Sequence, residues 1–166
     1  MASKNKADKG LAKKYIFFVL KFLAVFLLLS WLFDLNPVSD LLISFFVLVM
    51  RVILFALGQG TVNIVNNELV VNSVSMIVAK ECTGASMYAL FIAFAAAYGI
   101  SKKSWRYAIF GTLMLIGLNA LRLATIIIAA RFGIKVFNMV HDFLWPSTFF
   151  IFTLMTVLYY IRGGSK

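Results

Sequence analysis

The fold of this protein is decided by residues 105–130, which read WRYAIFGTLMLIGLNALRLATIIIAA. Asn119 and Arg122 interrupt an otherwise apolar run toward its C-terminal half. An α-helix needs about 20 predominantly apolar residues to cross the roughly 30 Å hydrocarbon core of a bilayer. A helix also satisfies its own backbone hydrogen bonds in lipid, so this segment predicts a membrane-spanning helix.

Further apolar runs surround this segment, at residues 15–33, 38–57, 83–100 and 143–161. The composition agrees, because 63% of the residues are hydrophobic and 13% are charged, with a mean hydropathy of +0.96. A soluble domain is roughly 45–50% apolar and about 25% charged. The sequence therefore excludes a water-soluble globule. It predicts an all-α integral membrane protein, a bundle of about five transmembrane helices in a single domain over residues 15–166.

Charge predicts which ends face the cytoplasm. The chain carries 16 Lys and Arg against 6 Asp and Glu, a net charge of +10. In a membrane protein this surplus is typical of cytoplasmic loops and of contacts with anionic lipids, so we expect no nucleic-acid partner. Residues 1–14 predict a basic cytoplasmic tail, and residues 102–106 and 162–166 are also basic. Five complete crossings would leave the C-terminus outside, so either one of the first two runs crosses incompletely or the C-terminal tail faces outward.

A short β-hairpin-like loop is predicted between the second and third runs. Residues 61–65 read TVNIV and residues 68–72 read ELVVN, with Asn66 and Asn67 between them. Turn residues between two β-branched runs indicate a hairpin at the membrane surface. Because the basic residues lie at the opposite end of the third run, we expect this loop on the external side, just before Cys82.

Three reactive side chains fall at similar predicted depths. Counting about 1.5 Å per helical residue from the basic ends puts Cys82 about 30 Å, Arg122 about 24 Å and His141 about 31 Å into the bundle. We therefore expect all three to converge just below the external surface. With one cysteine in the chain, neither an internal disulfide nor a multi-thiolate metal site can form. We expect no metal and no organic cofactor.

Cys82 and Arg122 each have a functional and a structural interpretation. Cys82 lies at the predicted start of a helix, where free backbone N–H groups and the helix dipole favour a thiolate, or it packs as a small apolar residue. Arg122 stabilises a thiolate or an oxyanion, with Asn119 on the same face holding its guanidinium. Its structural alternative is a partner for Glu81 or for a lipid headgroup.

His141, the single histidine, precedes the last helix. An imidazole suits proton transfer to and from a thiol or an amine near neutral pH, although a lone interfacial histidine also fits an ordinary surface residue. Asp142 is adjacent, but successive residues diverge around an α-helix, so we assign it no orienting role. Arg131 is expected to bind headgroups or a substrate carboxylate.

These residues, in this order, resemble the exosortase/archaeosortase family of membrane transpeptidases. The family pattern is a Cys followed by a small residue and Gly at a helix start, then Asn-x-x-Arg within the next helix, then a His before the last. Here these are Cys82-Thr83-Gly84, Asn119-Ala120-Leu121-Arg122 and His141. The resemblance covers roughly residues 38–161, and the chain is similar in size to the family's minimal core, without the extra helices of longer members.

The resemblance implies a cysteine protease or transpeptidase of the cell membrane, with its active site near the external face. Its partners would be membrane lipids and exported proteins with a C-terminal sorting signal, made of a short motif, a transmembrane helix and a basic end. Cys82 would form a thioester with the cleaved protein, Arg122 would stabilise charge, and His141 would transfer protons until an acceptor such as a lipid or glycolipid takes the new C-terminus. Three residues would support the site: Thr83, Gly84 and Asn119.

Two other functions use the same residues. A small multispan transporter or ligand-binding membrane subunit would hold an anionic ligand with Asn119 and Arg122, while Cys82 merely packs. A hydrolytic peptidase would use the same three reactive groups but would release a free acid instead of transferring the product to an acceptor.

Overall fold

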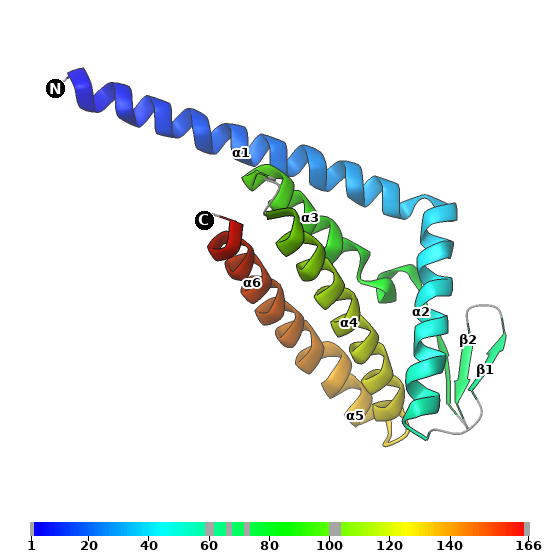
Figure 1. The fold of residues 1–166 in the computed structure, drawn as a ribbon. Helices are drawn as coiled ribbons and strands as arrows, with labels where there is room; N and C mark the ends of the chain where they lie inside the picture. Colours follow the sequence, from blue (N-terminus) through cyan, green and yellow to red (C-terminus); the bar gives the residue numbers. More distant parts are fainter. Residues whose placement is uncertain (1, 59–61, 66–67, 72–73, 100–103, 165–166) are drawn as a thin grey trace.

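The computed structural model describes residues 2–58, 62–65, 68–71, 74–99 and 104–164. The chain is predominantly helical (Figure 1). Its helices are α1 (Ala2–Asp34), α2 (Asn36–Ala56), α3 (Ala85–Tyr98), α4 (Ser104–Ala130), α5 (Ile134–Asn138) and α6 (Trp145–Gly164). Three strands follow α2: β1 (Val62–Val65), β2 (Glu68–Val71) and β3 (Val74–Ile77). A 3₁₀ helix, η1 (Lys80–Thr83), precedes α3, and a π-helix, η2 (Met139–Leu144), joins α5 to α6.

Four helical segments in the described part of the chain are long and apolar enough to cross a membrane: Leu11–Asp34, Asn36–Ala56, Ser104–Ala130 and Ile134–Gly163. The fifth predicted crossing, at residues 83–100, is the 14-residue helix α3, whose length of about 21 Å is shorter than a bilayer core. Gly84 and Gly99 limit this helix, because both have positive φ angles, 72° and 113°. The prediction of a full-length third span is therefore wrong.

The first two apolar runs form separate helices that meet at a corner. Leu35 joins them in an extended conformation, with φ −62° and ψ 129°, and a proline follows in the first turn of α2, where proline is well tolerated. Figure 1 shows α1 lying across the other helices, whereas α2 runs beside them. The basic segment predicted as a separate tail is helical from Ala2 and continues into α1. One contact of α1 with α3 is the edge-to-face pair of Phe18 and Phe94, whose ring centroids are 5.9 Å apart.

The core forms where α2, α3, α4 and α6 meet. Helices α4 and α6 lie side by side in opposite directions (Figure 1). At one end of this pair, Trp145 Nε1 donates a hydrogen bond to Thr125 Oγ1 over 2.7 Å. At the other end, the rings of Tyr107 and Tyr159 are 5.3 Å apart. The largest fully buried apolar side chains come from all four helices: Phe46, Met50, Leu54, Phe91, Leu115, Leu123 and Tyr160.

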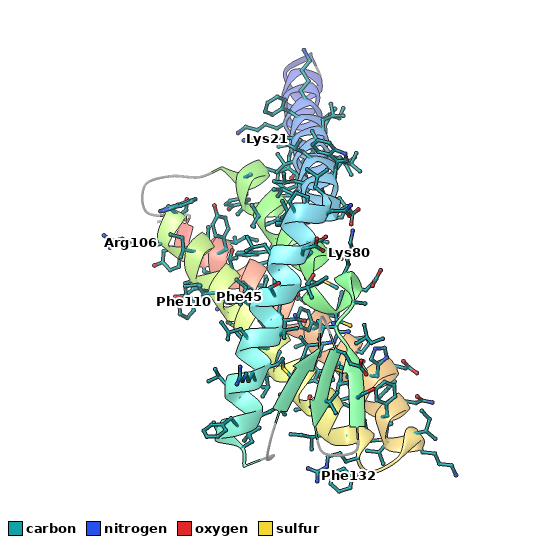
Figure 2. The ribbon with its side chains drawn as sticks, turned by 90° about the vertical axis from the view of Figure 1, so that its right-hand side faces the viewer. Lys21, Phe45, Lys80, Arg106, Phe110 and Phe132 are labelled. Atoms are coloured by element: carbon teal, nitrogen blue, oxygen red, sulfur yellow. The ribbon has the colours of Figure 1, made fainter. Side chains whose placement is uncertain are left out.

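The outer surface of the helices is apolar as well. On α2 the exposed large side chains recur at helical spacing: Leu41, Phe45, Leu48, Val52 and Phe55. Figure 2 shows Phe110 on α4 pointing away from the bundle, and Phe45 on α2 is also exposed. A helix that is apolar on both its inner and outer faces is expected in a membrane rather than in water. The described helices therefore support a membrane protein by their length and composition.

The strands form one antiparallel sheet in the order β1-β2-β3. Strands β1 and β2 occupy the positions predicted for the two arms of the hairpin, and they pair from Val62 opposite Val71 to Val65 opposite Glu68. A third strand, β3, was not predicted; it pairs with β2 from Glu68 opposite Ile77 to Val71 opposite Val74. Its four residues are too few to show a clear alternation, and they form a strand because β2 offers a second edge.

Candidate functional site

Cys82 lies in η1, the short turn between the sheet and α3. Its backbone N–H donates to Ala79 O over 3.0 Å, and Thr83 Oγ1 donates to Lys80 O over 2.7 Å, which closes the turn. We predicted that Cys82 begins the third helix, but it lies in η1 and precedes α3. Gly84, in a left-handed conformation, separates the two. The helix-dipole argument for a thiolate is correspondingly weaker, because the dipole acts mainly within the first turn of a helix.

The turn is tied to the corner between α1 and α2. Lys80 Nζ donates to Asp34 O and to Asn36 Oδ1, each over 3.2 Å, and Figure 2 shows Lys80 beside this corner. A pocket of about 280 Å³ opens here; its lining comprises Ser30, Phe33, Asp34, Ser39, Lys80, Glu81, Thr83, Ala85 and Ser86. Because Glu81 and Thr83 flank Cys82 in the sequence, the pocket borders the turn that carries the thiol.

Asn119, fully buried in the middle of α4, connects this helix to the cysteine. Its Nδ2 donates to the backbone carbonyl oxygen of Cys82 over 3.0 Å. We predicted that Asn119 would hold the Arg122 guanidinium, but Asn119 Oδ1, the atom that could accept from it, forms no hydrogen bond to Arg122, and the amide N–H holds the cysteine turn. A buried amide bonded to backbone in this way fixes the position of η1 against α4.

Gly84 is required for the close approach of η1 to α4. Its φ is 72°, and a Cβ placed there would lie 3.1 Å from Asn119 Oδ1 and 3.1 Å from Tyr88 Oη. An alanine at this position would meet both backbone strain and crowding.

We expect the Gly84→Ala substitution to reduce the free energy of unfolding by about 1–3 kcal/mol, the usual cost of a strained backbone conformation. The measurement is the apparent unfolding temperature of the purified protein in detergent. Gly117→Ala is the matched control, because no atom lies within 4 Å of a Cβ at Gly117 and alanine favours a helix over glycine by about 1 kcal/mol. Equal losses in both variants would contradict the assigned role of Gly84.

Polar atoms of three side chains on α3 and α4 are buried in this region: Tyr88 Oη, Asn119 Oδ1 and Arg122 Nε. The Tyr88 side chain is 3% exposed and that of Asn119 is fully buried. The Tyr88 hydroxyl lies against the side-chain amide of Asn119 and within electrostatic range of Arg122. Sequence reasoning missed Tyr88, although its position four residues after Gly84 puts both on one face of α3.

Arg122 lies one turn beyond Asn119 on α4. Its Cζ is 5.9 Å from the centroid of the Phe149 ring, a distance at which the ring attracts a cation. Below it, Thr125 Oγ1 donates to Arg122 O over 2.9 Å and accepts the Trp145 indole hydrogen bond. The predicted structural alternative, an ion pair with Glu81, is wrong, because the ion pair found among the described residues joins His141 to Asp142.

His141 lies in the π-helix η2 and pairs with its neighbour. His141 Nδ1 is 2.6 Å from Asp142 Oδ1, and the imidazole stacks on Phe137 with the ring centroids 5.4 Å apart. Our prediction that Asp142 has no orienting role assumed α-helical spacing and is wrong. A carboxylate on Nδ1 fixes the tautomer and leaves Nε2 free to exchange protons.

The three reactive groups spread along α4 instead of sharing one depth. Cys82 lies at the level of Asn119. The segment of His141 packs through Val140 against the apolar cluster that contains Ile126, about 10 Å further along the helix axis. The depth count failed because α3 is short and because helical structure begins before His141, at Ile134.

The Cys82, Arg122 and His141 side chains, all in the described part of the chain, share no direct hydrogen bond or ion pair. Asn119 on α4 holds the cysteine turn, Arg122 follows one turn later on the same helix, and η2, which carries His141, also contacts α4. In the described residues, no group of three or more His, Cys, Asp or Glu is placed to hold a metal ion. Comparison with protein-family models, curated proteins and solved structures found no match.

Proposed function

We propose that this protein is a membrane-embedded cysteine transpeptidase that cleaves C-terminal sorting signals of exported proteins and transfers the new C-terminus to an acceptor such as a lipid. One observation carries the proposal. The single thiol of the chain lies on a turn held by Asn119, and Arg122, one turn beyond Asn119 on α4, has a buried Nε without a hydrogen-bond partner. A guanidinium on the same face of α4 as the amide that holds the cysteine turn is suited to stabilising negative charge during acyl transfer.

The proposed arrangement in the membrane follows from the helices. Helices α2, α4 and α6 would cross the bilayer, and β3, η1 and α3 together would make a fourth passage. Figure 1 places the C-terminus near the start of α4, which agrees with the basic charge at both positions. Because α1 lies across the bundle, we infer that the first run does not complete a crossing parallel to the second, so that both termini face the cytoplasm. The corner between α1 and α2, to which Lys80 of the cysteine turn is bonded, would then lie toward the cytoplasm, and Cys82, level with Asn119, would lie within the bundle instead of just below the external surface.

The reaction would proceed through a thioester. His141 Nε2 takes the proton of Cys82, whose sulfur forms a bond to the scissile carbonyl carbon while Arg122 stabilises the charge on the carbonyl oxygen. The C–N bond then breaks, and the leaving amine takes the proton from His141. An acceptor hydroxyl or amine, deprotonated by His141, attacks the thioester and releases the Cys82 thiolate. This step requires His141 to approach Cys82 when substrate binds, because the segment of His141 packs about 10 Å further along α4.

The test is to look for an acyl group on Cys82. The protein is purified from native membranes under rapid denaturation, and its intact mass is measured before and after treatment with hydroxylamine, which cleaves thioesters. Since the chain has one cysteine, a hydroxylamine-sensitive adduct is assigned to Cys82 directly, and the released fragment identifies the substrate. Repeated absence of an adduct, with normal ligand uptake in Cys82→Ala, would replace the enzyme by a transporter.

The product distinguishes transfer from hydrolysis. Mass spectrometry of the processed protein should find its C-terminal carboxyl joined to an acceptor. A free carboxylic acid at this end would instead make the protein a hydrolytic peptidase that uses the same residues.

Arg122→Lys should lower the rate of processing by about 10²–10³-fold, the usual effect of losing a donor to a developing oxyanion. Lysine keeps the charge but lacks the planar fork and the Nε–H of the guanidinium. The measurement is the rate at which precursor is converted in membranes that contain equal amounts of each variant. Arg51→Lys, at an exposed position on α2, is the matched control and should process normally. Normal turnover in Arg122→Lys would remove this residue from the mechanism.

A further inference from the structure

Strand β3 forms an open edge of the sheet. In the part of the chain that the structure describes, β3 pairs with β2 alone, from Val71 opposite Val74 to Glu68 opposite Ile77, and no further backbone hydrogen bond reaches it. The side chains of Ser75 and Ile77 are exposed, that of Ile77 to 69%. The backbone groups along such an edge can pair with another extended chain.

The register of the hairpin decides which backbone groups face the open edge. Two residues separate Val71 from Val74, so this pair closes the hairpin with mutual hydrogen bonds. Hydrogen-bonded and non-hydrogen-bonded pairs alternate along an antiparallel ladder. Val74 and Met76 therefore direct their N–H and C=O groups toward β2, whereas Ser75 and Ile77 direct theirs toward the open edge.

The strand is fixed on the helices by its other face. Met76 packs against both apolar clusters of the bundle, and Val78, just after the strand, is 1% exposed. Successive side chains of a strand point to opposite faces, so the exposed side chains of Ser75 and Ile77 lie on the outer face. A chain that joined this edge would therefore extend a sheet that is already held in place.

The open edge leads directly to the thiol. Cys82 follows Ile77 by five residues, through the extended residue Ala79 and into η1. At about 3.3 Å per extended residue and about 2 Å per 3₁₀ residue, Cys82 lies at most about 16 Å beyond Met76 along the chain. An extended peptide covers this distance with about five residues.

The direction of β3 sets the direction of a partner strand. β3 leads into η1, which is bonded to the corner between α1 and α2. This corner lies toward the cytoplasm in the proposed arrangement, so β3 runs inward from the external side. A substrate with its exported part outside and its transmembrane helix next in the chain runs the same way. It would therefore pair parallel to β3.

We propose that the open edge of β3 binds the substrate segment before the scissile bond as a parallel fourth strand. One substrate residue, opposite Met76, donates its N–H to Ser75 O, and its carbonyl accepts from the Ile77 N–H, as in other parallel pairs. The bound segment is extended, and its backbone supplies the hydrogen bonds. The identity of this partner as the substrate rests on the proposed function.

The test uses peptides of alternating valine and threonine that end in a vinyl sulfone, with the full-length protein in detergent. The Cys82 sulfur adds to the terminal carbon of the double bond, and a proton from water completes the adduct, so labelling requires no turnover. With one cysteine in the chain, intact mass reports the rate. An eight-residue peptide should label Cys82 about three- to tenfold faster than a two-residue peptide, the effect of about one net hydrogen bond.

Methylation of single peptide nitrogens then tests the geometry of binding. Every second N–H of a parallel strand faces its neighbour, so methylation at alternate positions should slow labelling by about three- to tenfold. Methylation at the positions between them should leave the rate unchanged. The residue about five places before the sulfone should be sensitive, because it lies opposite Met76.

Ile77→Pro tests the edge from the side of the protein. It removes an N–H that faces the open edge and leaves the hydrogen bonds to β2 in place, a position at which proline is tolerated. This variant should lose the advantage of the long peptide. Ile77→Thr is the matched control, because it also removes the exposed apolar side chain but keeps the N–H, and it should retain the advantage. The unfolding temperatures of both variants show whether the sheet is intact.

Three results would overturn the proposal. They are equal labelling by long and short peptides or none by either, effects of methylation without a two-residue period, and equal losses in Ile77→Pro and Ile77→Thr. An advantage that disappears as the protein dimerises at higher concentration would instead assign the edge to a second copy of the chain. Failure of the proposed function is read separately, from the hydroxylamine-sensitive adduct on Cys82, on which these labelling rates do not depend.

Discussion

Replacing Cys82 with alanine should abolish processing, with a loss on the order of 10⁶-fold if the thiolate is the nucleophile, as in other enzymes that lose the attacking group. Precursors with intact C-terminal helices should accumulate, and no acyl adduct should form. The measurement is quantitative mass spectrometry of membrane proteins from cells that carry either sequence. Cys82→Ser, which keeps a side chain of nearly the same shape, should be almost as inactive because an unactivated hydroxyl is a poor nucleophile at neutral pH.

The stability of these variants provides the control. Cys82 is only partly buried, so alanine should change the unfolding temperature little. Processing at the normal rate in a stably inserted Cys82→Ala protein would show that the cysteine merely packs. If Cys82→Ala loses both insertion and processing, Cys82→Ser separates a folding defect from a catalytic one, because the serine variant should insert normally.

Replacing His141 with alanine should reduce processing by about 10²–10⁴-fold, the usual range for a general acid–base group. The imidazole is 41% exposed and contacts Asp142 and Phe137, so its removal leaves no cavity in the core and should not unfold the protein. Asp142→Asn should cause a smaller loss, because the amide still contacts Nδ1 but no longer stabilises the imidazolium. The rates are measured as precursor conversion in membranes.

Lys135→Ala is the matched control for His141, since Lys135 is an exposed basic residue of the adjacent helix α5. It should process normally. An unchanged rate in His141→Ala would assign the proton transfers to another group and would leave the His141–Asp142 pair as a surface contact.

The long helices could be predicted because their signal is local. The apolar run at residues 105–130 corresponds to α4, Ser104–Ala130, within one residue at each end. Apolar length alone decides such a segment, since no other structure satisfies the backbone of an isolated chain in lipid. The short α3 could not be predicted this way, because its apolar run continues through Gly84 and Gly99 while the backbone turns there.

One contact of the candidate site joins two residues that the sequence singled out, whereas other contacts were not predicted. Cys82 and Asn119 are 37 residues apart in the chain, and a hydrogen bond joins them. Tyr88 and Phe149 were missed because an aromatic residue in an apolar helix carries no signal of the polar atom or cation that it faces. The contact of Asp142 with His141 was not expected, because we assumed an α-helix where the chain forms a π-helix.

The sequence by itself determined that the chain forms apolar helices, that it carries a single thiol, and that one guanidinium interrupts an apolar run. These are properties of composition and of residues near one another in the chain, which hydropathy reports directly. Tertiary packing alone decided that α1 lies across the bundle, that Asn119 holds the cysteine turn, and that Tyr88 lies against Asn119 beside Gly84. The physical reason is that such contacts depend on the register between helices. Because these helices are apolar on every face, the sequence does not indicate which faces pack together.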